Sequence, residues 1–216
     1  MGCVPRPAPT LVLHMTRIER IPSVIGHGLL PDNAVLQRAI DGVKIGYRHI
    51  KDRRANRAVP CGTGGTLADY VPFYFAPRSP MLFAITRGQV SIEAARTEQI
   101  VYVVSSTQTL RAAGLTVVCS NRHAERAYAE LTDQDEVLDG DDFVDWPLMQ
   151  ERYWSDTADD PDRKDRRQAE CLHPNVPWGV ISEVVAKTER ARSQVEEILV
   201  TFGQTTPVIV RPDWYI

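Results

Sequence analysis

The chain has 216 residues, a length that suits one domain spanning residues 1–216. Hydrophobic residues make up 43% of it and charged residues 25%, which excludes a disordered or collagen-like protein, and no apolar run approaches the roughly 18 residues of a membrane helix. The net charge is −3, but seven acids and no Lys or Arg lie between residues 133 and 145, so the remainder is net positive and nucleic acid stays a candidate partner.

A strand and two short helices are the first predicted elements. Residues 10–15 (TLVLHM) form an apolar run that is typical of a short buried strand. Apolar residues at helical spacing predict a helix that begins close to Ile21 and ends at His27, with Gly28 at its C-cap. A second short helix is predicted over residues 33–41, stopped by the glycine that follows.

Residues 43–67 are polar, basic and rich in glycine, and they are predicted to form a long excursion over the surface that includes a helical turn. The basic residues of this stretch are Arg48, Lys51, Arg53, Arg54 and Arg57. Such a run is either a solvated helix face or a contact for phosphates. Helical spacing would put Arg53 and Arg57 on one side. Lys51 and Arg54 would lie on another, so one side could serve a diphosphate and the other a nucleic-acid backbone.

Strands and helices are also predicted along the rest of the chain. Apolar or alternating runs predict strands over residues 70–75, 81–86, 100–105, 115–119, 179–186 and 207–211, and residues 163–171 lead into another. Helical spacing predicts helices over residues 108–113, 122–131 and 189–202. The acidic segment 133–145 is predicted to be exposed and mobile. Because strands and helices do not alternate regularly, the pattern favours an α+β fold over a doubly wound α/β sheet.

The cysteines Cys3, Cys61, Cys119 and Cys171 lie far apart in the sequence, with no Cys-x-x-Cys motif and no histidine at zinc-finger spacing. Unpaired thiols are typical of a reducing compartment, so we expect a cytoplasmic protein without a structural metal and without a membrane partner. Sequence motifs of the common nucleotide-binding and hydrolase folds, such as Gly-x-Gly-x-x-Gly and Gly-x-Ser-x-Gly, are absent as well.

A few side chains are candidates for a functional site. The string DYVPFYFAPRSPM, residues 69–81, sets four aromatic residues beside three prolines, and its turn would hold Arg78 rigidly at a strand end. His14 and Thr16 are two residues apart, so they share one side of a strand. Glu170 is a single acid where a strand begins, and a buried carboxylate there needs a partner or a function. The residues alone do not choose among these candidates.

Five segments of the chain, taken together and in order, resemble a known family. They are LHMTRIERIPSVIGHGLLPDN, RHIKDRRANRAVP, DYVPFYFAPRSPM, SNRH and RQAE. With them the chain resembles the DarT family of toxins, which are DNA ADP-ribosyltransferases, from about Leu11 to the closing RPDWY. The string VPFYFAPRSPM is long and unusual, which makes the resemblance specific.

The resemblance implies an ADP-ribosyltransferase fold, with a split mixed β-sheet core, surrounding helices and a cleft for NAD+. It implies transfer of ADP-ribose from NAD+ to thymine in single-stranded DNA within a preferred sequence, with release of nicotinamide and a block to replication. It also implies a second partner, a macrodomain antitoxin that is encoded alongside and removes the mark.

The resemblance further implies roles for individual residues. Glu170 matches the family's catalytic glutamate. Arg54 matches an arginine that is needed for activity, with Arg53 beside it, and both are expected to bind NAD+. His14 and Thr16 match the element that receives the nicotinamide end of NAD+.

The resemblance also implies which residues cover the dinucleotide and which bind DNA. Residues 35–57 correspond to the element that folds over the dinucleotide. Arg78, Met81 and His123 fall where the family binds its DNA substrate and target base. The segment 133–145 is more acidic than a DNA-facing loop should be, which departs from that pattern.

Two alternatives stay open from the sequence. The first keeps the fold and changes the acceptor to guanine, RNA or a protein side chain, because nothing in the acceptor-side residues excludes guanine. The second is a non-catalytic module that binds nucleic acid or a protein partner through the basic run and the aromatic residues, without binding NAD+.

Overall fold

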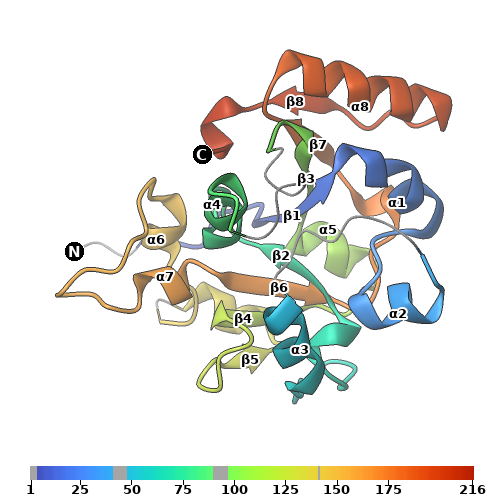
Figure 1. Cartoon of the computed structure of the whole chain (residues 1–216). Helices are drawn as coiled ribbons and strands as arrows, with labels where there is room; N and C mark the ends of the chain where they lie inside the picture. The colour runs from blue at the N-terminus through green and yellow to red at the C-terminus, as the bar shows by residue number, and fades with distance from the viewer. Residues whose placement is uncertain (1–3, 41–47, 90–96, 141) are drawn as a thin grey trace.

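A mixed β-sheet forms the centre of the molecule (Figure 1). The computed structural model describes residues 4–40, 48–89, 97–140 and 142–216, and in these ranges eight strands follow the order β5-β4-β6-β2-β1-β3-β7-β8. The strands are β1 (Leu11–Arg17), β2 (Val71–Tyr74), β3 (Ile100–Ser106), β4 (Val118–His123), β5 (Leu131–Thr132), β6 (Ala169–His173), β7 (Glu183–Ala186) and β8 (Val208–Val210). Among these strands, β7 and β8 pair in parallel and the other neighbours pair antiparallel.

Helices surround the sheet, which confirms the predicted α+β class (Figure 1). The α-helices are α1 (Ile21–His27), α2 (Asp32–Gln37), α3 (Arg48–Asn56), α4 (Pro80–Thr86), α5 (Thr107–Ala112), α6 (Trp146–Gln150), α7 (Arg163–Arg166) and α8 (Glu189–Thr201). The 3-10 helices are η1 (Ile18–Arg20), η2 (Leu67–Asp69), η3 (Thr97–Gln99), η4 (Asp135–Asp139), η5 (Trp178–Val180) and η6 (Pro212–Trp214). In the described part of the chain, none of the helices has the length and apolar character that crossing a bilayer requires.

The sheet is split between β1 and β2. These two strands are in register at a single pair, Leu13 opposite Tyr74, whereas β1 pairs with β3 along the whole of Leu11–Arg17. The remaining residues of β1 have no register partner on β2. The split mixed sheet expected for an ADP-ribosyltransferase is therefore present, and the separation leaves room for a cavity.

Alternation along the central strands places apolar side chains on both faces of the sheet. Val12, Val101 and Val103 belong to a core that α1, α5 and α8 cover. Leu13 and Tyr102, one residue along each strand, belong to a second core that α4 and the C-terminal residues cover. Because successive residues of a strand point to opposite faces, such a continuous apolar run is the pattern of a strand buried on both sides.

The predicted strand over residues 81–86 is wrong, because this apolar run forms α4. The side-chain oxygen of Ser79 caps the helix by accepting a hydrogen bond from the Leu82 N–H at 3.2 Å, and Pro80 occupies the first turn. Both are ordinary helix-start signals. A short apolar run fits a buried helix as well as a strand, so the cap at Ser79 is the feature that indicates a helix here.

The predicted helix over residues 122–131 is also wrong. The strand expected over residues 115–119 begins at Val118 and continues to His123, which pairs with Ala169 on β6. A turn and the short strand β5 replace the rest of the expected helix. This correction matters for the site, because it moves His123 from a helix to a strand end beside β6.

The acidic segment 133–145 is not simply exposed and mobile. Leu138 and Val144 are fully buried in the core, and the Asp135 carboxylate accepts hydrogen bonds from Arg6 at 2.9 Å and Arg111 at 3.0 Å. These contacts fasten the described part of the segment to the N-terminal residues and to α5. Asp135, Asp139 and Asp145 are therefore paired with arginines.

The strand predicted over residues 179–186 is wrong in its first half, because η5 covers Trp178–Val180 and β7 begins only at Glu183. The remaining predicted elements agree with the structure apart from their ends. The basic excursion over residues 43–67 contains a helix of nine residues, α3, rather than a single turn, and its residues 43–47 lie outside the described ranges. The end of the helix expected over residues 33–41 also lies outside them, and the described part of that helix is α2.

Candidate active site

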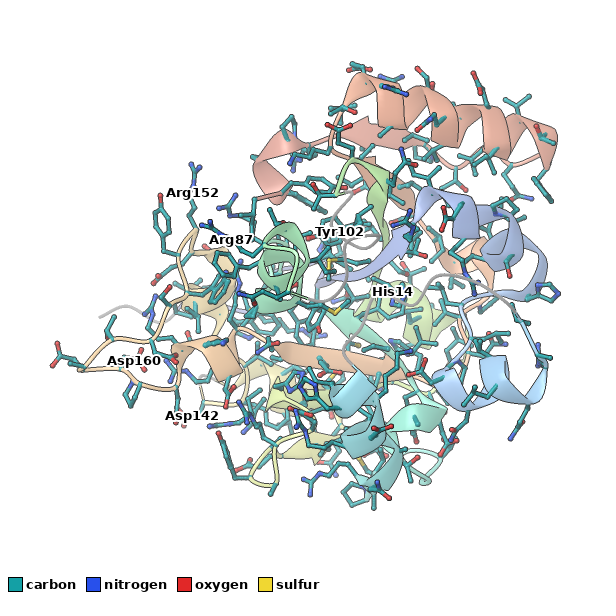
Figure 2. The ribbon with its side chains drawn as sticks, in the orientation of Figure 1. His14, Arg87, Tyr102, Asp142, Arg152 and Asp160 are labelled. Atoms are coloured by element: carbon teal, nitrogen blue, oxygen red, sulfur yellow. The ribbon has the colours of Figure 1, made fainter. Side chains whose placement is uncertain are left out.

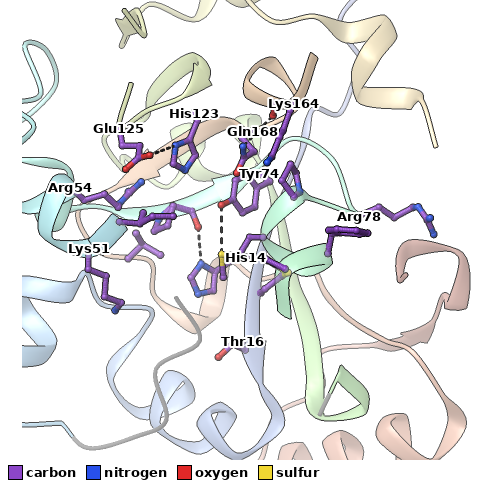
Figure 3. Close-up of a pocket in the computed structure, with 18 of the residues that line it drawn as sticks. His14, Thr16, Lys51, Arg54, Tyr74, Arg78, His123, Glu125, Lys164 and Gln168 are labelled. Atoms are coloured by element: carbon purple, nitrogen blue, oxygen red, sulfur yellow. Dashed lines mark hydrogen bonds and ion pairs between the residues drawn. The ribbon is translucent and has the colours of Figure 1, made fainter. Parts of the chain in front are cut away.

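A cavity of about 940 Å³ opens where β1 and β2 separate (Figure 3). Its lining combines His14 from β1, Lys51 from α3, Pro72 from β2, Met81 from α4 and His123 from β4. Segments that are distant in the sequence thus meet around one hollow. Its volume is at the upper end of the roughly 300–1,000 Å³ of small-molecule sites, which suits a ligand as large as a dinucleotide.

Glu170 on β6 lies directly behind this cavity. It is fully buried, and its Oε2 accepts a hydrogen bond from Nη1 of Arg54 at 2.7 Å. Its Oε1 accepts a hydrogen bond from the backbone N–H of Ala124 at 3.2 Å. A buried carboxylate is tolerated only when it is paired and hydrogen-bonded, and here both oxygens have partners.

Glu170 is covered rather than open to the cavity. Its neighbours Arg54, Tyr74 and His123 all line the cavity, while Glu170 itself has no exposed surface. Tyr74 is its register partner on β2, and Nε2 of His123 lies 3.8 Å from its Oε1. One layer of side chains therefore separates the Glu170 carboxylate from the cavity.

Arg54 is buried on α3 and completes this ion pair. Burial by itself would lower the pKa of its guanidinium, but the carboxylate of Glu170 outweighs that effect and the pKa is raised. Nη2 of Arg54 also donates to the carbonyl of Leu67 at 3.4 Å. Arg54 is therefore a permanent positive charge at the cavity wall.

The predicted division of the basic helix is present, but both sides bind protein groups. Arg53 donates to the Glu125 carboxylate at 2.6 and 3.0 Å, and Arg57 donates to the carbonyl of Ala129 at 3.1 Å. On the other side, Arg54 pairs with Glu170. Lys51 on that side pairs with Asp32 of α2, and both residues line the cavity.

His14 and Thr16 both line the cavity from β1, as their spacing predicts. Nδ1 of His14 lies 2.7 Å from the carbonyl oxygen of Pro72, which can only accept, so Nδ1 carries the proton and Nε2 is left as an acceptor. Burial lowers the pKa of His14, although the bond to Pro72 acts against this. The imidazole is thus neutral at physiological pH and held in one tautomer.

Arg78 and His123 also line the cavity (Figure 3). Met81 lines it as well. Arg78 has a φ of 57°, unusual for a residue other than glycine, and its guanidinium donates to the carbonyl of Tyr215. The guanidinium of Arg78 is thus held by the C-terminal residues, and its role toward DNA stays a prediction. Sδ of Met81 lies 3.8 Å from the hydroxyl of Tyr74.

Three lining residues had no role in the prediction from sequence. Glu125 contacts both Arg53 and His123, and Trp154 donates its indole N–H to the carbonyl of Arg78 at 2.6 Å. Gln168 stands two residues before Glu170, a spacing that puts two residues on one side of a strand and could have indicated it. No comparable signal marks Trp154.

Two of the cysteines that are distant in the sequence are neighbours in space. Cys119 and Cys171 face each other across β4 and β6 with their sulfurs 3.7 Å apart, and both are buried and free. The described residues contain no group of three or more His, Cys, Asp or Glu side chains that could hold a metal ion.

Comparisons with known proteins find a family model and solved structures that match most of the chain. A family model described as "ssDNA thymidine ADP-ribosyltransferase, DarT" matches residues 13–216. A DNA ADP-ribosyl transferase from Thermus sp. (strain 2.9) is 38% identical over 213 residues, which cover 97% of each chain. The structure of Thermus sp. 2.9 DarT in complex with ADP-ribosylated ssDNA matches all of both chains with a TM-score of 0.90 and 35% identity. Its complex with NAD+ matches 97% of this chain and 99% of that one, with a TM-score of 0.83 and 34% identity.

Proposed function

Because this chain belongs to the DarT family of single-stranded-DNA thymidine ADP-ribosyltransferases, we propose that the buried Arg54–Glu170 pair is the centre of its reaction with NAD+. The chain is an enzyme that transfers ADP-ribose from NAD+ to thymidine in single-stranded DNA and releases nicotinamide. The observation that carries our assignment is a carboxylate paired with an arginine at the wall of a cavity of dinucleotide size.

The chemistry of the reaction assigns a task to Glu170. Breaking the bond between nicotinamide and ribose develops oxocarbenium character at the sugar, as in glycoside hydrolysis. A carboxylate that accepts a hydrogen bond from the adjacent ribose hydroxyl steadies this cation and acts most strongly in the transition state. Since Arg54 and His123 cover Glu170, we infer that one of these side chains moves aside when the ribose binds.

Thymine must lose the proton of its ring N–H before the nitrogen can attack, because neutral thymine is a poor nucleophile. We assign the acceptance of this proton to Glu170 and the stabilisation of the thymine anion or the diphosphate to Arg54. A duplex hides this edge of thymine in base pairing, which accounts for the requirement for single strands. Aromatic residues at the cavity, such as Trp154, offer faces on which unpaired bases stack.

The remaining site residues receive roles consistent with their places. His14 and Thr16 would hold the nicotinamide end of NAD+, and Arg53 would support the dinucleotide side through α3. Arg78, Met81 and His123 would contact the DNA. These roles stay predictions.

The acceptor is tested with single-stranded oligonucleotides that each contain one type of reactive base in an otherwise uniform sequence. We expect a mass gain of one ADP-ribose on the oligonucleotide with thymine and none on the others. Modification of guanine alone, of RNA, or of protein in place of DNA would overturn the assignment of the acceptor. A protein that binds DNA but is not stabilised by NAD+ would be the non-catalytic module instead.

Replacing His14 with Ala is expected to weaken NAD+ binding about 10-fold, which corresponds to about 1.4 kcal/mol, the value of one hydrogen bond. The neutral Nε2 acceptor is lost, and the cavity wall loses the ring that packs against Phe73. A thermal-shift titration with NAD+ measures the change, because a ligand that binds only the native state raises its stability. His27→Ala, at the exposed end of α1, is the matched control. Wild-type affinity in His14→Ala would contradict the assigned role.

We further propose that residues 1–216 form one catalytic domain, that the reaction takes place in the cytoplasm, where NAD+ and replicating DNA are present, and that the transfer is toxic because it blocks replication. A cognate macrodomain antitoxin that removes the mark is part of the same proposal. Its support is the resemblance to the toxin family.

A further inference from the structure

Glu125 is an acid beside the catalytic pair that no sequence motif marks. It lies two residues after β4, and its side chain is only 4% exposed. Arg53 donates two hydrogen bonds to its carboxylate, and Nδ1 of His123 lies 3.3 Å from its Oε1 (Figure 3). His123 therefore lies between two carboxylates, Glu125 on its Nδ1 side and Glu170 on its Nε2 side.

The Glu125 carboxyl is ionised throughout the physiological range. Partial burial alone would raise its pKa, but the hydrogen bonds from His123 and Arg53 outweigh burial and lower the pKa to about 2. An ionised carboxylate can only accept hydrogen bonds. Nδ1 of His123 must then carry a proton, which fixes the tautomer and presents Nε2 toward Glu170.

Nε2 of His123 and Oε1 of Glu170 are 3.8 Å apart, about 1 Å more than a hydrogen bond between them would span. With Nδ1 turned toward Glu125, Nε2 is the ring nitrogen of His123 that faces Oε1 of Glu170. One added proton would turn this contact into a hydrogen bond. The pair is therefore arranged to receive a single proton close to the reacting base.

We propose that Glu125, held by Arg53, is a positioning residue that orients His123 so that the His123–Glu170 pair takes up the proton of thymine. This inference rests on the proposed function. In the step, the thymine ring N–H bond breaks and its proton passes to the His123–Glu170 pair. The ring nitrogen forms the bond to C1′ of the ribose, and nicotinamide leaves with the electrons of the glycosidic bond. The proton is later released to solvent.

Other charged and titratable groups surround His123 and Glu125 from every neighbouring element. They are Arg53 and Arg54 on α3, Tyr74 on β2, Arg126 on the turn after β4, Asp165 on α7 and Glu170 on β6. The arginines stay charged, and burial raises the pKa of Tyr74. Burial would raise the pKa of Asp165 as well, but the hydrogen bonds from Arg126 and Tyr128 lower it.

The test is the pH profile of kcat for transfer to a single-thymine oligonucleotide. Near pH 7, Glu125→Ala is expected to be about 100-fold slower than the wild type, the lower end of the range for general base catalysis, with an unchanged KM for NAD+. The deficit should shrink toward alkaline pH, because thymine then begins to lose its proton unaided. Glu125→Gln, whose amide oxygen can still accept from Nδ1, should lie between Glu125→Ala and the wild type.

Two controls separate the outcomes. Glu130→Gln, an exposed acid on the same connection, should keep the wild-type profile. Glu170→Gln tests the proposed function itself. If this variant transfers ADP-ribose as fast as the wild type, the role proposed for Glu170 is wrong, whatever the result for Glu125. If Glu170→Gln is inactive while Glu125→Ala keeps the wild-type rate, or loses rate equally at every pH, the positioning role of Glu125 is overturned. Should Glu125→Ala fail to fold, the profile of Glu125→Gln decides in the same way.

Discussion

Replacing Glu170 with Gln is expected to lower kcat for ADP-ribose transfer at least about 1,000-fold, because the substitution removes both the charge that steadies the developing cation and the acceptor for the thymine proton. Gln has nearly the same shape and can still accept a hydrogen bond from Arg54. NAD+ binding should therefore survive, and the loss should fall on kcat rather than on KM. Single-turnover transfer to a thymine oligonucleotide, followed by mass spectrometry, measures the effect.

The matched control is Glu183→Gln, the same substitution on β7, outside the residues that line the cavity. It should transfer at the wild-type rate. A Glu170→Gln enzyme within about 10-fold of the wild type would exclude Glu170 as the group that acts in the transition state.

The second large effect concerns stability as well as activity. Arg54→Ala leaves the Glu170 carboxylate buried without its charged partner, which is expected to lower the free energy of unfolding by about 3–5 kcal/mol. The double variant that combines Arg54→Ala with Glu170→Gln also removes the charge of Glu170. It should regain part of the lost stability and none of the activity. Urea denaturation measures the stabilities, and the double-mutant cycle isolates the coupling between the two residues.

Arg53→Ala provides the contrast, because the Arg53 guanidinium is half-exposed and Glu125 keeps His123 as a second partner when Arg53 is lost. Its effect on stability should be much smaller than that of Arg54→Ala. Equal losses of stability from Arg53→Ala and Arg54→Ala would contradict the claim that the burial of the Arg54–Glu170 pair makes the loss of Arg54 more costly.

Much of the fold could be predicted where the signal is local. The helix over residues 189–202 has an amphipathic spacing and a glycine stop, and α8 covers Glu189–Thr201. The apolar run over residues 81–86 is too short to separate a strand from a helix, and only the cap at Ser79 indicates the helix. His123 was assigned to a helix because its strand depends on pairing with Ala169, which is distant in the sequence.

The functional site, like the fold, could be predicted from the sequence only in part. The resemblance to the DarT family implies roles for Glu170 and Arg54, and the structure brings their side chains into contact. No motif indicated that Glu170 is covered by the residues that line the cavity, because burial is a property of the packed sheet. Glu125 was missed because its partner Arg53 lies 72 positions away and nothing local links the two.

A structure of Glu170→Gln with NAD+ bound is the measurement that tests the account most directly. We expect the nicotinamide ribose to place a hydroxyl within about 3 Å of the side chain at position 170, with Arg54 or His123 moved from its present place and His14 beside the nicotinamide. A dinucleotide bound elsewhere, or a ribose still separated from position 170 by Arg54 and His123 in their present positions, would contradict it.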